Sequence, residues 1–152
     1  MGKAPVYVRS FENGFARTVQ VRFGDCDPAG IVFYPRYVEM FNNLVEDWCA
    51  QGLGLSFYEM IQVRGLGLPT VSLATDFIAP SRLGEELRAE LSVRDVGGAK
   101  IMLAIRLSGA DGSERVAATV ILVLTDLRAG CAKRIPDAMR VSIERFRPPR
   151  QL

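Results

Sequence analysis

The chain contains no histidine among its 152 residues, and this absence narrows the chemistry that it can perform. Without an imidazole there is no Ser-His-Asp or Cys-His catalysis, and the commonest metal ligand in proteins is missing. Its three cysteines, Cys26, Cys49 and Cys131, are too few and too widely spaced for a disulfide framework or a zinc site. A reaction must therefore use carboxylates, backbone dipoles, Lys, Arg, Tyr or an unassisted thiol, and we expect neither a metal nor a redox cofactor.

Long apolar runs and strong net charge are also missing. The first fourteen residues hold no apolar stretch of signal-peptide length, and no run approaches the roughly 20 apolar residues that span a bilayer. A net charge of +2, with no basic block interleaved with aromatic residues, does not indicate nucleic-acid binding. We therefore expect a cytoplasmic protein without nucleic-acid or membrane partners, folded as a single domain over residues 1–152.

Hydrophobic periodicity predicts an α+β fold. Alternating apolar residues indicate a first strand over residues 15–23, with Phe23 on its inward face. Apolar side chains at three- and four-residue steps predict a long helix over about residues 34–51, with Pro35 in its first turn. The later patterns predict, in chain order, a short helix over 56–65, strands within 68–79, 85–95, 100–109 and 115–127, and a tail helix over 136–146.

The last strand pattern, residues 115–127, is apolar on both faces. One helix layer covers only one face of a sheet, so the second face needs another cover. A partner subunit and the tail helix of the same chain are the two candidates. We expect the partner subunit, and hence an oligomer.

The segment "FGDCDPAGIVFYP", residues 23–35, holds the candidate chemistry. Asp27 precedes Pro28, which disfavours helical backbone at Asp27 and leaves its side chain less committed to its own turn. Gly30 lets the chain reverse or approach a ligand closely. The helix that begins at Tyr34 presents unpaired amides and the positive end of its dipole within a few residues of the carboxylate.

Two interpretations of this segment stay open. In the first, Asp25 and Asp27 only cap N–H groups of their own turn. In the second, Asp27 attacks a carbonyl or activates water while the helix amides bind the oxyanion, which is sufficient for an activated ester such as a thioester. Cys26 is a poorer candidate nucleophile, because no histidine deprotonates it and its flanking carboxylates raise its pKa.

The stretch "VRFGDCDPAGIVFYPRYVEMFN", residues 21–42, resembles the signature of the hotdog-fold 4-hydroxybenzoyl-CoA thioesterase family. The resemblance is nearly continuous from Phe23 to Tyr37 and weaker but collinear through the later strands. It implies a hotdog fold, in which a five-stranded antiparallel sheet wraps a long central helix. It also implies an acyl-CoA thioesterase, with CoA as part of the substrate, that forms homodimers assembled into homotetramers.

The resemblance also assigns roles to individual residues. It makes Asp27 the catalytic carboxylate and gives the backbone N–H of Tyr34 the task of polarising the thioester carbonyl. Asn42 stands where the 4-hydroxybenzoyl enzymes of the family have an acidic residue that contacts the ring hydroxyl of the substrate. Lys100 is what remains of a basic cluster that those enzymes turn toward the CoA phosphates. The expected substrate-binding residues are Gly30, Phe33, Asn42 and Lys100.

The acyl group stays open at this point. Aromatic groups such as 4-hydroxybenzoyl or benzoyl, and short-to-medium aliphatic groups, are all compatible with the sequence. A non-catalytic module that binds acyl-CoA or an acyl carrier protein is the alternative function. A dehydratase of the same fold normally needs a histidine, which this chain lacks.

Overall fold

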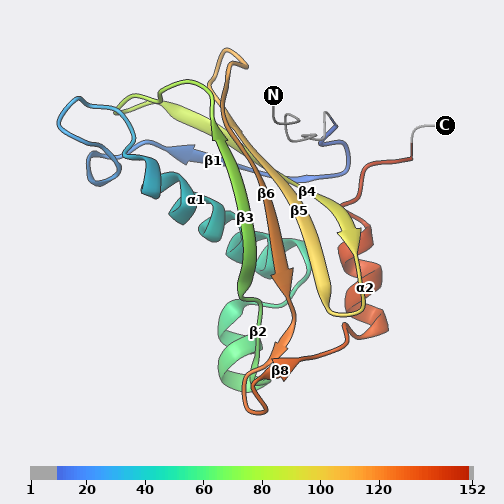
Figure 1. The fold of residues 1–152 in the computed structure, drawn as a ribbon. Coiled ribbons are helices and arrows are strands. Elements are labelled where there is room, and N and C mark those ends of the chain that lie inside the picture. The colour runs from blue at the N-terminus through green and yellow to red at the C-terminus, as the bar shows by residue number, and fades with distance from the viewer. Residues whose placement is uncertain (1–9, 151–152) are drawn as a thin grey trace, which may run out of the picture.

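The computed structural model describes residues 10–150, in which a five-stranded antiparallel sheet curves around one long helix (Figure 1). The strands follow the order β1-β4-β5-β6-β3 across the sheet, so β1 and β3 form its two edges. The α+β prediction is confirmed. The expectation that the first fourteen residues do not form a signal peptide concerns in part residues 1–9, which lie outside the described residues. The strands are β1 (Phe15–Gln20), β3 (Thr70–Phe77), β4 (Glu86–Val96), β5 (Lys100–Ser108) and β6 (Glu114–Val123).

Helix α1 (Tyr34–Asp47) lies in the concave face of this sheet and continues into a π-helical turn, Trp48–Gly52. The sequence pattern placed the helix here because its apolar residues recur at helical spacing and Pro35 fits the first turn. Full burial of one such aliphatic side chain stabilises the fold by about 1.5–3 kcal/mol. The buried residues of α1 are Tyr37, Met40, Phe41, Leu44 and Val45.

Two features of the N-terminal half differ in detail from the sequence pattern. Strand β1 ends at Gln20, and Phe23 opens a 3-10 turn, η1 (Phe23–Asp25), with its side chain 85% exposed. The expectation that Phe23 faces inward is therefore wrong, because alternation alone does not reveal where the strand stops. The short second helix is present over residues 57–63, of which η3 (Glu59–Val63) is π-helical. The Ser56 Oγ accepts the Glu59 N–H (3.1 Å) where this helix begins.

A second, three-stranded sheet lies at the end of the molecule away from the N-terminus of α1 (Figure 1). It consists of β2 (Leu66–Gly67), β7 (Thr125–Asp126) and β8 (Cys131–Ala132). Strands of two residues have no periodicity, which is why the sequence did not predict them. Within residues 10–150, no helix is both long and apolar enough to cross a membrane.

Helix α2 (Asp137–Glu144) is the predicted tail helix, and it packs beside β4 (Figure 1). The Phe146 ring that follows it lies edge-on to Trp48, with ring centroids 5.9 Å apart, and the Phe146 carbonyl accepts the Val93 N–H (3.1 Å). On the outer face of β6, Ile121 stays half-buried. Cover of that face by a partner subunit remains a prediction.

Candidate active site

The connection between β1 and α1 folds into a short hairpin over residues 25–33. The Asp27 N–H donates to the Ile31 carbonyl (2.9 Å) near its tip, and the Phe33 N–H donates to the Asp25 carbonyl (2.9 Å) at its base. Side chains that pair across an antiparallel ladder share one face, so Asp27 and Phe33 lie on the same side of the hairpin. The hairpin thereby returns the chain from Asp27 to the start of α1.

Cys26 and Val32 occupy the opposite face of the hairpin, where they form an antiparallel bridge. Val32 is buried and Cys26 packs against the core. Partial burial, together with the carboxylates of Asp25 and Asp27, raises the pKa of the Cys26 thiol. This environment favours a structural role for Cys26 over a nucleophilic one.

Gly30 forms the turn of the hairpin. Its φ of +77° lies in the left-handed region that favours glycine, and its N–H donates to the Asp27 carbonyl (3.0 Å). A Cβ added at Gly30 would meet no atom within 4 Å. Of the two roles considered for Gly30, the structure shows the chain reversal.

Asp27 is half-buried, and the two oxygens of its carboxylate differ in their hydrogen bonding. Its Oδ1 accepts the Ala29 N–H (2.8 Å), so one oxygen caps its own turn. The Oδ2 atom accepts no hydrogen bond from any residue in the described part of the chain. Asp25 differs, because its Oδ2 accepts the Arg22 N–H (2.9 Å) and holds the base of the hairpin. Asp27 therefore keeps one carboxylate oxygen for a ligand.

The first turn of α1 offers one free amide. Pro35 has no N–H, and the Arg36 N–H donates to the Phe33 carbonyl (2.8 Å). The Tyr34 N–H has no acceptor among residues 10–150, as expected for the first residue of a helix. This amide lies at the positive end of the α1 dipole, where it is suited to bind a developing negative charge.

Aromatic side chains gather at the first turn of α1. The rings of Phe33 and Phe77 lie 5.4 Å and 6.0 Å from the Tyr34 ring, centroid to centroid, and all three side chains are exposed. Phe77 ends β3, so these contacts join the edge strand of the sheet to the first turn of α1. Exposed aromatic groups gathered at one place indicate a binding surface.

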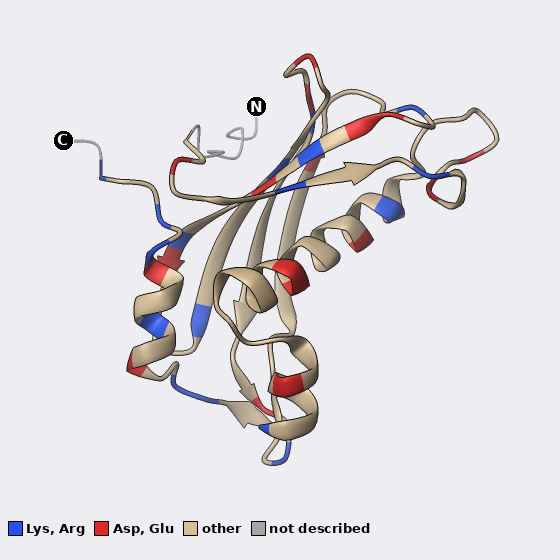
Figure 2. Cartoon of the chain, turned by 180° about the vertical axis from the view of Figure 1, so that it is seen from behind, with Lys and Arg blue, Asp and Glu red and all other residues tan. Residues whose placement is uncertain are grey.

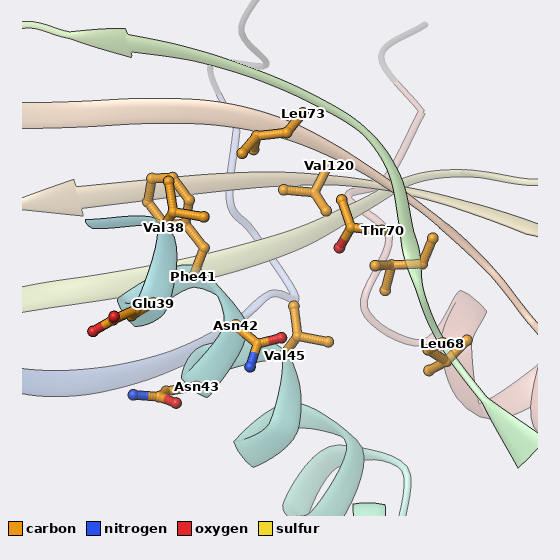
Figure 3. Close-up of a pocket in the computed structure, with 11 residues that line it drawn as sticks. Val38, Glu39, Phe41, Asn42, Asn43, Val45, Leu68, Thr70, Leu73 and Val120 are labelled. Carbon is orange, nitrogen blue, oxygen red and sulfur yellow. The ribbon is translucent and has the colours of Figure 1, made fainter. Parts of the chain in front are cut away.

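A cavity of about 460 Å³ lies between α1 and β3 (Figure 3). Val38 and Asn42 follow Tyr34 at four-residue steps, so they lie on the same side of the helix. Tyr34 and Asn42 are about 12 Å apart along the helix axis at ~1.5 Å per residue. The cavity is lined by Val38, Glu39, Phe41, Asn42, Asn43 and Val45 of α1 and by Leu68, Thr70, Leu73, Val120 and Leu122.

Lys100 lies apart from the other predicted site residues. It begins β5, whose length of about 26 Å at ~3.3 Å per residue separates Lys100 from the sheet end nearer the hairpin. The Ile135 N–H donates to the Gly98 carbonyl (2.8 Å), which brings Lys133 and Arg134 to the same end of the molecule. Figure 2 shows the positive charge of this segment, which follows β8.

The structure thus joins four of the six predicted residues in one hairpin and helix start, Asp27, Gly30, Phe33 and Tyr34. Asn42 lines the cavity between α1 and β3. The described residues contain no group of three or more cysteine, aspartate or glutamate side chains that could hold a metal ion.

Two residues at the site were not singled out from the sequence. The Tyr37 hydroxyl donates to the Ser81 Oγ (2.9 Å), and both side chains are buried. A tyrosine on the core side of a helix signals that its hydroxyl needs a partner. The partner itself, 44 residues away in the chain, is a product of the tertiary fold.

Comparisons with known proteins agree with this architecture. The sequence profile of the thioesterase-like superfamily matches residues 21–143. A 1,4-dihydroxy-2-naphthoyl-CoA hydrolase from Synechocystis sp. is 28% identical over 98 residues, 64% of this chain and 70% of that protein. The acyl-CoA thioesterase YbgC of Haemophilus influenzae is 28% identical over 96 residues, 63% of this chain and 70% of that protein.

A solved structure gives the same result for the fold. A 1,4-dihydroxy-2-naphthoyl-CoA thioesterase from Synechocystis superimposes with a TM-score of 0.78 at 24% identity, covering 86% of this chain and 95% of that one. The long helix wrapped by a five-stranded antiparallel sheet is therefore the hotdog fold.

Proposed function

The chain belongs to the thioesterase-like superfamily, a family of thioester hydrolases, and we propose that it is an acyl-CoA thioesterase. Its proposed reaction hydrolyses an aromatic or a short-to-medium acyl-CoA to the free acid and CoA. The observation that carries the proposal is the hairpin that returns Asp27, with one oxygen unbonded within the described chain, to the free amide of Tyr34.

In the proposed mechanism the thioester carbonyl oxygen accepts the Tyr34 N–H. Negative charge that develops on this oxygen is stabilised by the amide and the helix dipole. Removal of one such hydrogen-bond donor from an enzyme costs about 2.7–4 kcal/mol of transition-state stabilisation. Asp27 then acts in one of two ways. It attacks the carbonyl carbon to form an anhydride that water hydrolyses, or it accepts a proton from the water that attacks. In both routes the C–S bond breaks and CoA leaves as the thiolate.

The cavity between α1 and β3 is the proposed acyl site. Its volume of about 460 Å³ falls in the range of small-molecule sites, and Val38 and Leu73 supply apolar walls. The Asn42 amide can donate and accept a hydrogen bond, so it can meet a polar substituent without requiring one. These properties support aromatic acyl groups, with or without a ring hydroxyl, and aliphatic groups of similar length.

A second copy of the chain is the proposed partner. Strand β3 is a sheet edge whose residues are exposed along almost its whole length, including Val71 and Leu73. Pairing of two such edges would satisfy their backbone groups and cover the apolar side chains. We propose a homodimer joined through β3 and assembled into a homotetramer, acting in the cytoplasm. In that assembly Lys100 would contact the phosphates of a CoA held mainly by another subunit.

The Asp27→Asn variant tests the proposed function. Thiol release should be measured with 4-hydroxybenzoyl-CoA, benzoyl-CoA and a series of linear acyl-CoA substrates. We expect kcat to fall by about 10²–10⁴-fold, the usual contribution of a positioned base. The asparagine Oδ1 can still accept the Ala29 N–H, so the fold should persist.

Asp25→Asn is the matched control, because Asp25 holds the hairpin without a proposed chemical step. Turnover by Asp27→Asn at the rate of the unmodified protein would remove Asp27 from the mechanism.

The Ala29–Asp27 cap favours the alternative of a non-catalytic acyl-CoA or acyl-carrier-protein binding module. Thermal stabilisation by acyl-CoA without thiol release from any substrate would support that module.

A further inference from the structure

We propose that Ser81 is a positioning residue for the thioesterase reaction, on the premise that the proposed function holds. Ser81 would set the spacing between the Asp27 hairpin and the first turn of α1, and thus between the carboxylate and the Tyr34 amide. It lies in the connection between β3 and β4, outside the motif that carries the candidate chemistry.

Ser81 is bonded to both halves of the site. Through its side chain it accepts the Tyr37 hydroxyl (2.9 Å), one helical turn beyond Tyr34. Through its backbone carbonyl it accepts the Val32 N–H (2.9 Å) from the hairpin. Ser81 is 0% exposed and Tyr37 is 4% exposed, so water does not compete for these bonds.

The residues that follow Ser81 run along the second arm of the hairpin. The Leu83 N–H donates to the Gly30 carbonyl (3.0 Å), and Arg82 forms an antiparallel bridge with Ile31. The hairpin is therefore fastened to this segment at three successive residues. It cannot shift relative to α1 without breaking these contacts.

The segment is in turn anchored to the sheet by Arg115 of β6. The Arg115 guanidinium donates to the Pro80 carbonyl (3.0 Å) and forms an ion pair with Glu85. The Glu85 Oε2 also accepts the Arg82 N–H (3.1 Å). The residues on both sides of Ser81 are therefore held in place. Through them the sheet, and not a free loop, fixes the position of the hairpin.

Removal of either hydroxyl should loosen this connection. Ser81→Ala leaves the buried Tyr37 hydroxyl without its partner, and Tyr37→Phe removes the same bond with almost no change of shape. A displacement of reacting groups by about 1 Å can lower a rate by about 100-fold. Because Ser81 would retain its backbone bond to Val32, we expect a smaller loss, about 10-fold in kcat, with KM changed by less than about twofold.

Ser92→Ala is the matched control. Ser92 is also 0% exposed, but it lies on β4 and its Oγ has no hydrogen-bond partner within residues 10–150. All variants should be assayed for thiol release well below their melting temperatures. We expect Ser92→Ala to retain kcat, and the double variant Tyr37→Phe/Ser81→Ala to be no slower than the slower single variant, because both changes remove one interaction.

Hydrogen exchange supplies a readout that does not depend on turnover. The Val32 and Leu83 amides, which donate across the contact between the hairpin and the Ser81 segment, should exchange faster in Tyr37→Phe than in the unmodified protein, while amides of β5 should not change. Wild-type kcat in both variants, even with lowered melting temperatures, would overturn the positioning role and leave Ser81 as a structural residue.

Should Ser81→Ala fail to fold, the nearly isosteric Tyr37→Phe decides the question alone. An unmodified protein that releases no thiol overturns the proposed function, and the positioning role with it. An active protein with unaffected variants overturns the positioning role only.

Discussion

Cys26, Cys49 and Cys131 are all free thiols, but their surroundings differ. Burial, with a smaller effect of the Glu46 carboxylate, raises the pKa of Cys49 to about 12. Partial burial and the neighbouring carboxylates also raise the pKa of Cys26, whereas Cys131 is exposed on β8. Because the thiolate is the reactive form, the folded protein should present one reactive cysteine.

Alkylation with iodoacetamide at pH 8, followed by peptide mass spectrometry, tests this order. We expect Cys131 to be modified first, Cys26 more slowly, and Cys49 only after unfolding in guanidinium chloride. In Asp27→Asn the modification of Cys26 should accelerate, because one of the carboxylates that raise its pKa is removed. Modification of Cys26 faster than Cys131 in the native protein would contradict the structural role of Cys26.

The residues of the site were predictable to different degrees. Asp27, Gly30, Phe33 and Tyr34 lie within eight consecutive positions, so local turn and helix-start chemistry places them together. The sequence left two roles open for Asp27, and the structure shows the cap on one oxygen beside an oxygen without a partner in the described chain. Ser81 could not be predicted, because its contacts arise only when the β3–β4 connection meets the hairpin.

Helix α1 serves the fold with one side and the cavity with another. Its core side carries Tyr37, Met40 and Leu44, which are buried, whereas Val38 and Asn42 are exposed toward the cavity (Figure 3). Side chains on the second side contribute little to the free energy of unfolding, because little of their surface is removed from water. Substitutions on this side should therefore alter substrate preference with little effect on the free energy of unfolding.

Asn42→Asp should shift the preference toward a hydroxylated ring. A carboxylate accepts a hydrogen bond from a ring hydroxyl more strongly than an amide does, and bonds to charged groups contribute about 1.5–3 kcal/mol. We expect the ratio of kcat/KM for 4-hydroxybenzoyl-CoA over benzoyl-CoA to rise by about 10-fold.

Asn43→Asp is the control for this change, because Asn43 also borders the cavity but Figure 3 shows its side chain turned away from Thr70. It adds the same charge but should leave the ratio within about twofold. An equal rise in both variants would indicate a general effect of charge at the cavity rather than contact with Asn42.

The elements themselves were largely readable from the sequence. Each of the five long strands and α1 has enough residues for its hydrophobic period to stand out. The two-residue strands β2, β7 and β8 have none, and they form only because the chain segments at that end of the molecule meet. The error at Phe23 arose because a strand-like pattern continued past Gln20, where the backbone already turns into η1.

Association of whole chains is tested at the exposed edge of the sheet. Val71 on β3 is 58% exposed, and a lysine there should oppose edge pairing through charge repulsion between two copies. We expect the unmodified protein to be a dimer or tetramer by size-exclusion chromatography with light scattering, and Val71→Lys to shift it toward the monomer.

Val141→Lys is a matched control, because Val141 on α2 is also 58% exposed but lies away from β3. It should leave the molar mass unchanged. A monomeric unmodified protein, or equal dissociation by both lysine variants, would rule out β3 as the contact between subunits.

The separation of α1 into a buried side and a cavity side has a consequence for how such a protein diversifies. Val38 and Asn42 contribute little to the free energy of unfolding, because both are exposed. Mutations at these positions can therefore accumulate without compensating changes in the core. Evolution or engineering can therefore change the preferred acyl group by single substitutions, and each variant along the way remains folded.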